Sequence, residues 1–164
     1  MSLEFVGREE ARNINELAHP IWIEVFGPMI TGGIPETERI FRSWLNPEEI
    51  ARTMDGGRRY AYVKEKGETI GFAAVDIEPG GAMFISKIYL KKEFRGKGFG
   101  SEALRDLVEY GRVNGCSVAY LHVNVKNAEA IKAYERNGFE RKVHEITYLG
   151  DGDCINDYHM YRSI

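Results

Sequence analysis

A glycine-rich turn is the part of this sequence whose residue types point most directly to chemistry. It lies between an apolar run typical of a strand and an amphipathic run typical of a helix. Glycines let the backbone turn so that several N–H groups face one spot, and the N-terminus of the following helix adds partial positive charge. Arg95 and Lys97 add full charges, so an anion is the predicted ligand and a pyrophosphate fits best. The turn consists of Arg95, Gly96, Lys97, Gly98, Phe99, Gly100 and Ser101.

The spacing of these glycines differs from two common nucleotide-binding motifs. Neither G-x-G-x-x-G nor G-x-x-x-x-G-K-[ST] occurs in the sequence. Taken alone, the turn has a plainer alternative interpretation, because many glycine turns only cap the helix that follows.

A second patterned segment follows at residues 121–139. An apolar strand-like run ends at Val123, and Asn127 stands where a helix N-cap is expected. Gly138 is placed to end that helix in the left-handed conformation. Tyr134 lies between them, on the predicted inner face of the helix.

The two segments, in this order, resemble the coenzyme-binding signature of the GNAT family of N-acetyltransferases. The resemblance covers residues 86–139. It implies one acetyltransferase domain over residues 1–164, with the α/β GNAT acyl-CoA N-acyltransferase fold and a mixed central sheet with helices on both faces. It also implies acetyl-CoA as cosubstrate, no metal, and attack of a neutral amine on the acetyl thioester. The matching residues are Arg95, Gly98 and Gly100, then Leu121, Val123, Asn127, Ala130, Tyr134, Gly138 and Phe139.

The family also implies roles for individual residues. The strand segment that pairs through its backbone with the pantetheine arm is Ile88, Tyr89 and Leu90, and the Leu90 N–H is the candidate oxyanion donor. The residues from Arg95 to Ser101 hold the pyrophosphate, and Asn127 contacts the pantetheine or the turn beside it. Tyr134 protonates the departing coenzyme A thiolate; the alternative is an aromatic ring that only packs.

The group that takes the proton from the amine stays open. A lysine-like amine titrates near 10.4, so making it neutral at pH 7 costs about 4–5 kcal/mol. His122 is expected to lie on the strand beside the cleft, and Glu24 lies in the first helical region. Each also has a plain structural interpretation, and neither is assigned as the base.

The acceptor amine is suggested by the C-terminal residues. His144, the acidic segment 150–153, Asp157 and Met160 resemble the end of the PaiA-type spermidine/spermine N-acetyltransferases. Carboxylates suit a polycation, although residues 150–153 also read as a simple hairpin turn. The other acceptors considered are a protein N-terminus, a lysine and another small-molecule amine. A non-catalytic acetyl-CoA-binding regulator is the remaining alternative.

Composition narrows the class of protein. The chain has 164 residues, enough for one domain with a real core. Its net charge of −3 and pI of about 5.9 argue against nucleic acid as the main partner. No run is long and apolar enough for a membrane helix, and no signal pattern is present. We therefore expect a cytoplasmic enzyme with a small-molecule amine substrate and neither a nucleic-acid nor a membrane partner. A homodimer is one assembly considered.

The elements that must position these residues follow from hydrophobic periodicity. A mixed sheet with helices on both faces is expected from their order. Residues 118–123 form a nearly continuous apolar run and are predicted to be buried on both faces. The predicted helices are residues 9–26, 35–44, 47–54, 99–111 and 127–136, and the predicted strands are residues 3–6, 60–64, 69–77, 82–90, 118–123, 139–149 and 154–161.

Overall fold

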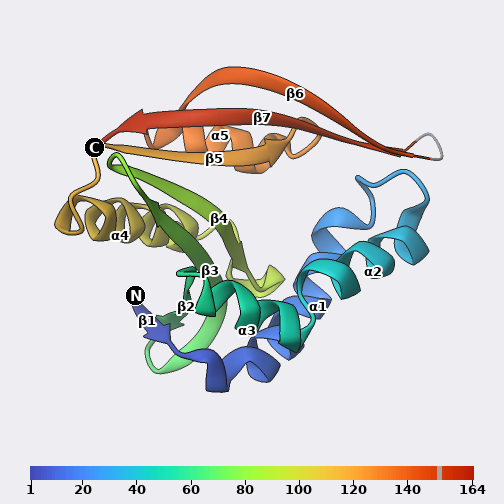
Figure 1. Ribbon diagram of the computed structural model, residues 1–164, viewed down its shortest axis with the longest axis horizontal. Coiled ribbons are helices and arrows are strands. Elements are labelled where there is room, and N and C mark those ends of the chain that lie inside the picture. The colour runs from blue at the N-terminus through green and yellow to red at the C-terminus, as the bar shows by residue number, and fades with distance from the viewer. Residues whose placement is uncertain (151–152) are drawn as a thin grey trace.

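In the computed structural model, residues 1–150 and 153–164 are described, and they form a seven-stranded sheet with helices on both faces (Figure 1). The strand order is β1-β2-β3-β4-β5-β7-β6. β4 and β5 run parallel and the other neighbouring pairs run antiparallel. The predicted mixed sheet is therefore confirmed. The strands are β1 (Ser2–Val6), β2 (Arg59–Glu65), β3 (Glu68–Glu78), β4 (Ala82–Leu90), β5 (Val118–Asn124), β6 (Glu140–Gly150) and β7 (Asp153–Ser163).

The helices divide into two groups. α1 (Ala11–Phe26), α2 (Gly33–Trp44) and α3 (Pro47–Asp55) pack on the face of the sheet that carries Tyr60 and Phe72. α4 (Phe99–Val113) and α5 (Ala128–Arg136) pack on the opposite face (Figure 1). Among the described residues, none of these helices is long and apolar enough to cross a bilayer.

Local chemistry explains where several helices begin. The Asn46 side chain accepts a hydrogen bond from the Glu49 N–H at 2.8 Å and caps α3, and Pro47 occupies the first turn. The Asn127 side chain caps α5 in the same way, as predicted. α2 begins at Gly33, two residues before the predicted start at Pro35. Pro35 therefore lies inside the first turn, where the missing N–H of proline costs no helical hydrogen bond.

The burial of β5 corrects the sequence prediction for that strand. Ala119, Leu121 and Val123 are buried under α4 and α5, but His122 on the other face is exposed. The strand is thus buried on one face only. The reason is that α1, α2 and α3 pack over β2, β3 and β4, so the same face of β5 and β7 has no helix over it.

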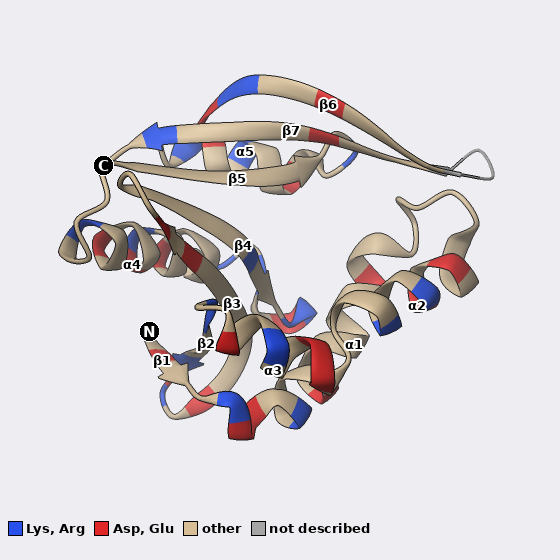
Figure 2. Ribbon diagram, in the orientation of Figure 1, with Lys and Arg blue, Asp and Glu red and all other residues tan. Residues whose placement is uncertain are grey.

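Charged residues of both signs are mixed along the helices. Figure 2 shows Lys and Arg interspersed with Asp and Glu on α2, α3 and α4. Several neighbours form ion pairs one helical turn apart, such as Glu49 with Arg52.

Candidate active site

β4 and β5 separate halfway along their length. They pair from Ala82 with Val118 to Ile85 with Leu121, and beyond this point no pairing between them is present in the described part of the chain. The rest of β4 continues to pair with β3. A register shift between Ala74 and Val75 leaves Ser86 as an extra residue, so a β-bulge lies at the point of separation.

The separated half of β4 has free backbone groups on the side of β5. The Lys91 N–H donates to the Ile70 carbonyl at 2.8 Å and therefore points toward β3. Backbone groups alternate along an antiparallel ladder, so the N–H groups of Ile88 and Leu90 point the other way. The segment that was expected to pair with pantetheine thus has two N–H donors facing the gap, of which only that of Leu90 was singled out from the sequence.

The glycine-rich turn supplies further free donors at the N-terminus of α4. In the part of the chain that the structure describes, none of the N–H groups of residues 96–101 donates to a carbonyl. Gly96 and Gly98 are left-handed, with φ of 70° and 89°, and a side chain added at either would meet open space. The backbone is thus a cradle of N–H groups at a helix N-terminus, which suits a phosphate-type anion.

The side chains of this turn have partners within the protein. Arg95 Nε donates to the Leu90 carbonyl and its Nη1 pairs with the Glu24 carboxylate, each at 3.0 Å. Arg95 Nη2 is buried and has no hydrogen bond with any described residue. The Ser101 hydroxyl accepts a hydrogen bond from Asn137 at 2.9 Å. The backbone and Lys97 are therefore the groups most available to a ligand, whereas Arg95 ties β4 to α1.

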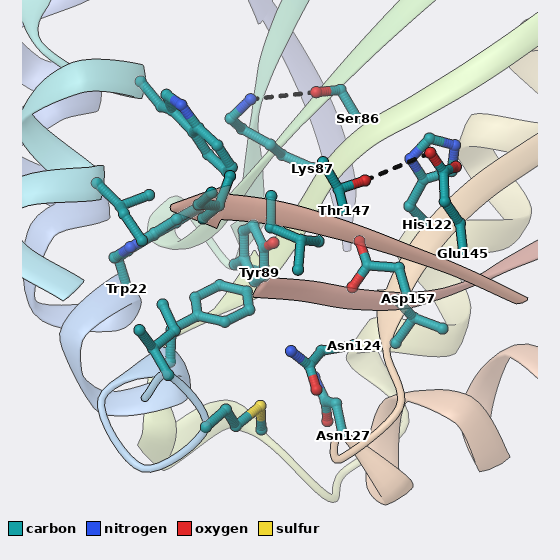
Figure 3. A pocket seen from close by; sticks show the side chains of 18 of the residues that line it. Trp22, Ser86, Lys87, Tyr89, His122, Asn124, Asn127, Glu145, Thr147 and Asp157 are labelled. Atoms are coloured by element: carbon teal, nitrogen blue, oxygen red, sulfur yellow. Dashed lines mark hydrogen bonds between the residues drawn. The ribbon is translucent and has the colours of Figure 1, made fainter. Parts of the chain in front are cut away.

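A cavity of about 540 Å³ lies between α1–α3 and the open face of the sheet. One wall is aromatic, with Trp22 6.1 Å from both Trp44 and Tyr89 between ring centroids. The other wall is polar and comes from β4 to β7 (Figure 3). Its polar residues are Ser86, Lys87, His122, Asn124, Glu145, Thr147, Asp157 and His159.

Some of the residues predicted from the sequence line the cavity, and others lie in the glycine-rich turn. Tyr89, Asn127 and Tyr134 line the cavity, whereas the residues from Arg95 to Ser101 lie outside it at the N-terminus of α4. Ile88 and Leu90 pack against the core and contribute backbone groups. The fold therefore places the predicted residues along a path from the helix N-terminus to the cavity.

Tyr134 is held in a form that can donate a proton. Burial raises the pKa of its hydroxyl to about 12, so the group is protonated at neutral pH. The hydroxyl has no hydrogen-bond partner among the residues described. Burial also raises the pKa of Tyr89, so this hydroxyl is protonated as well. Both tyrosines line the cavity.

The polar wall carries a short ladder of titratable groups. His122 stacks on His159 with ring centroids 3.8 Å apart, and His159 pairs with Glu145 at 2.9 Å. Although His122 is exposed overall, partial burial of its ring on the cavity wall, then the neighbouring His159, lowers its pKa. Burial raises the pKa of Asp157, which makes no hydrogen bond or ion pair with any described residue. The charge of His159 partly opposes this shift, but among the described residues no cation contacts the Asp157 carboxylate directly.

Sequence reasoning missed Lys87 and Ser86 and assigned Asp157 no role at the site. Lys87 is 9% exposed, although lysines are almost never this buried without a partner. The sequence did offer one indication of this site, a cationic residue between the apolar Ile85 and Ile88.

The acidic turn proposed for the acceptor lies at residues 150–153. Residues 151–152 and the side chain of residue 153 fall outside the described part of the structure.

Comparison of the sequence with known proteins identifies its family. The model of the acetyltransferase (GNAT) family matches residues 20–139. An uncharacterized N-acetyltransferase of Methanocaldococcus jannaschii is 35% identical over 110 residues, which cover 63% of this chain and 46% of that protein. The spermine/spermidine N(1)-acetyltransferase of Bacillus subtilis is 26% identical over 83 residues, which cover 46% of this chain and 55% of that protein. The chain thus spans about half the length of these curated relatives.

A solved structure is similar over the whole fold. The crystal structure of the PaiA N-acetyltransferase of Thermoplasma acidophilum, in complex with coenzyme A, superposes with a TM-score of 0.78. It covers 100% of both chains at 20% sequence identity. At that identity the likeness supports the fold, and the chemistry must be argued from the residues of this chain.

Proposed function

Because the chain belongs to the acetyltransferase (GNAT) family, we propose that it transfers the acetyl group of acetyl-CoA to an amine, and that this amine is a polyamine such as spermidine or spermine. Three features support the proposal: free backbone donors for the coenzyme, a protonated phenol beside the cavity, and a polar wall that presents a carboxylate to the acceptor. The coenzyme supplies the activated acetyl thioester. The protein must hold it, stabilise the developing oxyanion and move protons.

The residues fit the coenzyme at two places. The free N–H groups of residues 96–101 suit the pyrophosphate, with Lys97 adding charge. The N–H groups of Ile88 and Leu90 suit the amide-containing arm and the thioester oxygen. Asn127, already the N-cap of α5, lies in the cavity wall between these regions and the acceptor.

The acceptor nitrogen then forms a bond to the acetyl carbon as the carbon–sulfur bond breaks. A backbone N–H of β4 stabilises the oxyanion, because its position is fixed before the reaction. Tyr134 donates its proton to the departing thiolate. The acceptor enters as an ammonium and leaves as an amide, so it gives up two protons, one of which replaces the proton lost by Tyr134.

The observation that carries the polyamine proposal is the unpaired carboxylate of Asp157 in the cavity wall. A partly buried carboxylate without a direct counterion is destabilised, and a distal ammonium group of the acceptor would relieve that cost. Opposite it, Trp22 and Trp44 offer apolar and π surface to the methylene chain and its cations. The similarity to the Bacillus subtilis spermine/spermidine N(1)-acetyltransferase supports the same acceptor.

The test compares spermidine with a simple monoamine in Asp157→Asn. Removing the charge should raise the KM for spermidine by about 10-fold and change that for the monoamine little, because Asp157 is partly buried and a fully buried charge pair contributes about 2–5 kcal/mol. Asp106→Asn is the matched control, because Asp106 is exposed on α4, which packs on the opposite face of the sheet. An unchanged ratio of spermidine to monoamine turnover in Asp157→Asn would remove the polyamine proposal.

A further inference from the structure

Ser86 and Lys87 occupy the point where β4 leaves β5. The β-bulge makes Ser86 an extra residue, so Ser86 and its neighbour Lys87 both line the cavity. Lys87 Nζ lies 3.1 Å from the Ser86 Oγ, within hydrogen-bond distance (Figure 3). The mechanism outlined above uses neither side chain.

Charged residues surround Lys87, but among the described residues none forms an ion pair with it. Arg58 and Asp76 face it from the start of β2 and from β3, and Glu49 faces it from α3. The two Arg58–Asp76 hydrogen bonds are 2.9 Å and 2.6 Å long, so this carboxylate is already neutralised. Glu49 is held by Arg52.

These surroundings favour the neutral amine. Burial first, then the positive charge of Arg58, lowers the pKa of Lys87 to about 7, against the opposing effect of Asp76 and Glu49. The groups across the cavity are His122 and Asp157, together with the Glu145–His159 pair. A cationic acceptor bound among them would favour the neutral form of Lys87 further.

We infer that Lys87, acting through the Ser86 hydroxyl, is the proton acceptor that neutralises the amine for acetyl transfer. The inference rests on the proposed function. The acceptor ammonium gives a proton to Ser86 Oγ as the Ser86 hydroxyl proton passes to Lys87 Nζ. The neutral nitrogen then attacks, and its second proton replaces the one that Tyr134 gave to the thiolate. Lys87 returns its proton to water, so the sum is one amide, one thiol and one released proton.

His122 is the competing proton acceptor, because it also lines the cavity and its pKa is lowered. It lies on β5, stacked on His159, whereas Ser86 lies on the strand that carries the free N–H groups of Ile88 and Leu90. The proton acceptor must be close to the reacting nitrogen, and the nitrogen must be close to those donors. Position therefore favours the Ser86–Lys87 pair.

The kinetic test uses two replacements of Lys87 that separate proton transfer from packing and charge. Lys87→Met keeps the apolar stem, and Lys87→Arg keeps a cation that cannot become neutral at working pH. Both should lower kcat by about 10²- to 10⁴-fold with an unchanged KM for acetyl-CoA. Ser86→Ala should show a smaller loss. Lys142→Met is the control, since the Lys142 side chain is 55% exposed and paired with Glu140 on β6.

The pH dependence of kcat/KM is a further test, because a purely structural role of Lys87 would not change it. The parent kcat/KM should rise with pH through about 7, as Lys87 loses its proton, and this rise should be absent from the residual activity of Lys87→Met. Activity of Lys87→Arg within threefold of the parent would overturn the inference. So would a loss in His122→Gln that exceeds the loss in Lys87→Met.

A direct titration separates this inference from the proposed function. In protein labelled with ¹³C at the lysine side chains, the Lys87 signal is assigned by its absence in Lys87→Met. It should titrate near pH 7, well below the value of about 10.4 that is typical of a lysine in water. Titration of Lys87 near 10 would overturn the inference even if the protein acetylates amines. A neutral Lys87 in a protein that acetylates no amine would overturn the proposed function and the inference with it.

Discussion

At the scale of single residues, Tyr134 carries the clearest assignment of a chemical role. Its hydroxyl lies in the cavity wall and stays protonated at neutral pH. Tyr134→Phe removes only the hydroxyl, so coenzyme binding should persist while turnover falls by about 10²- to 10⁴-fold. Steady-state kinetics together with calorimetric titration of coenzyme A measure both quantities. Turnover within twofold of the parent would reduce Tyr134 to a packing role beside Phe139.

Burial of the Lys87 ammonium group lowers the free energy of unfolding, and this effect can be measured independently of catalysis. Its pKa is lowered from 10.5 to about 7 in the folded protein, so the unfolded chain binds more protons between these values. The parent should therefore become more stable as pH rises from about 7 to 10.5, and the cost of burial is fully present below pH 7. Each pKa unit corresponds to about 1.4 kcal/mol.

Lys87→Met should remove this cost. In a domain of this size each kcal/mol changes Tm by roughly 2–4 °C, so Lys87→Met should melt several degrees higher than the parent at pH 7. The gain should shrink at pH 10. Thermal unfolding followed by circular dichroism at both pH values is the measurement, with Lys142→Met as the control. A gain of the same size at both pH values would mean that Lys87 is not neutralised by burial.

At the scale of elements, the sequence predicted where most helices and strands lie. β4 has the predicted bounds, and α4 and β5 begin at the predicted residues, because periodicity and glycines mark these ends. The prediction that β5 is buried on both faces was wrong, because periodicity within a strand does not show which face a distant helix covers. The bulge at Ser86 also gave no signal, since it arises from the register between β3 and β4.

The glycine-rich turn is the element whose role is easiest to disrupt. Gly98→Asp adds a carboxylate beside the free N–H groups and strains a residue with φ of 89°, so the affinity for acetyl-CoA should fall by about 100-fold or more. Calorimetry on folded protein measures the change. Gly80→Asp is the matched control, because Gly80 has φ of 92° and equally open surroundings in the turn between β3 and β4. Equal affinities in the two variants would contradict the pyrophosphate assignment.

At the scale of the whole molecule, the cavity joins segments that are far apart in the sequence. Trp22 of α1, Lys87 of β4 and Asp157 of β7 line one space. Figure 1 shows the β6–β7 hairpin extending toward α2, and residues of all three elements line the cavity. The two coenzyme motifs could be found from sequence because each is local. The acceptor site could not, because its residues meet only after the sheet has formed.

The net charge of the cavity should make acceptor binding sensitive to salt. A polyamine carries several ammonium groups, and the carboxylates of Glu145 and Asp157 face the cavity that it would enter. Exposed charges are screened over about 8–10 Å at physiological ionic strength, so the KM for spermidine should rise with salt. The KM for a monoamine should change less. Kinetics between low and high salt, at constant coenzyme concentration, measure the difference; equal slopes for the two amines would argue against acidic recognition.

The most direct test of the account is whether the parent protein makes an acetylated polyamine. Purified protein is incubated with acetyl-CoA and spermidine, thiol release is followed continuously, and the polyamine product is identified by mass spectrometry. The proposed function predicts one acetyl group on spermidine for each thiol released, with Tyr134→Phe and Gly98→Asp both defective. Thiol release without acetylated spermidine, or no release above the rate without protein, would contradict it.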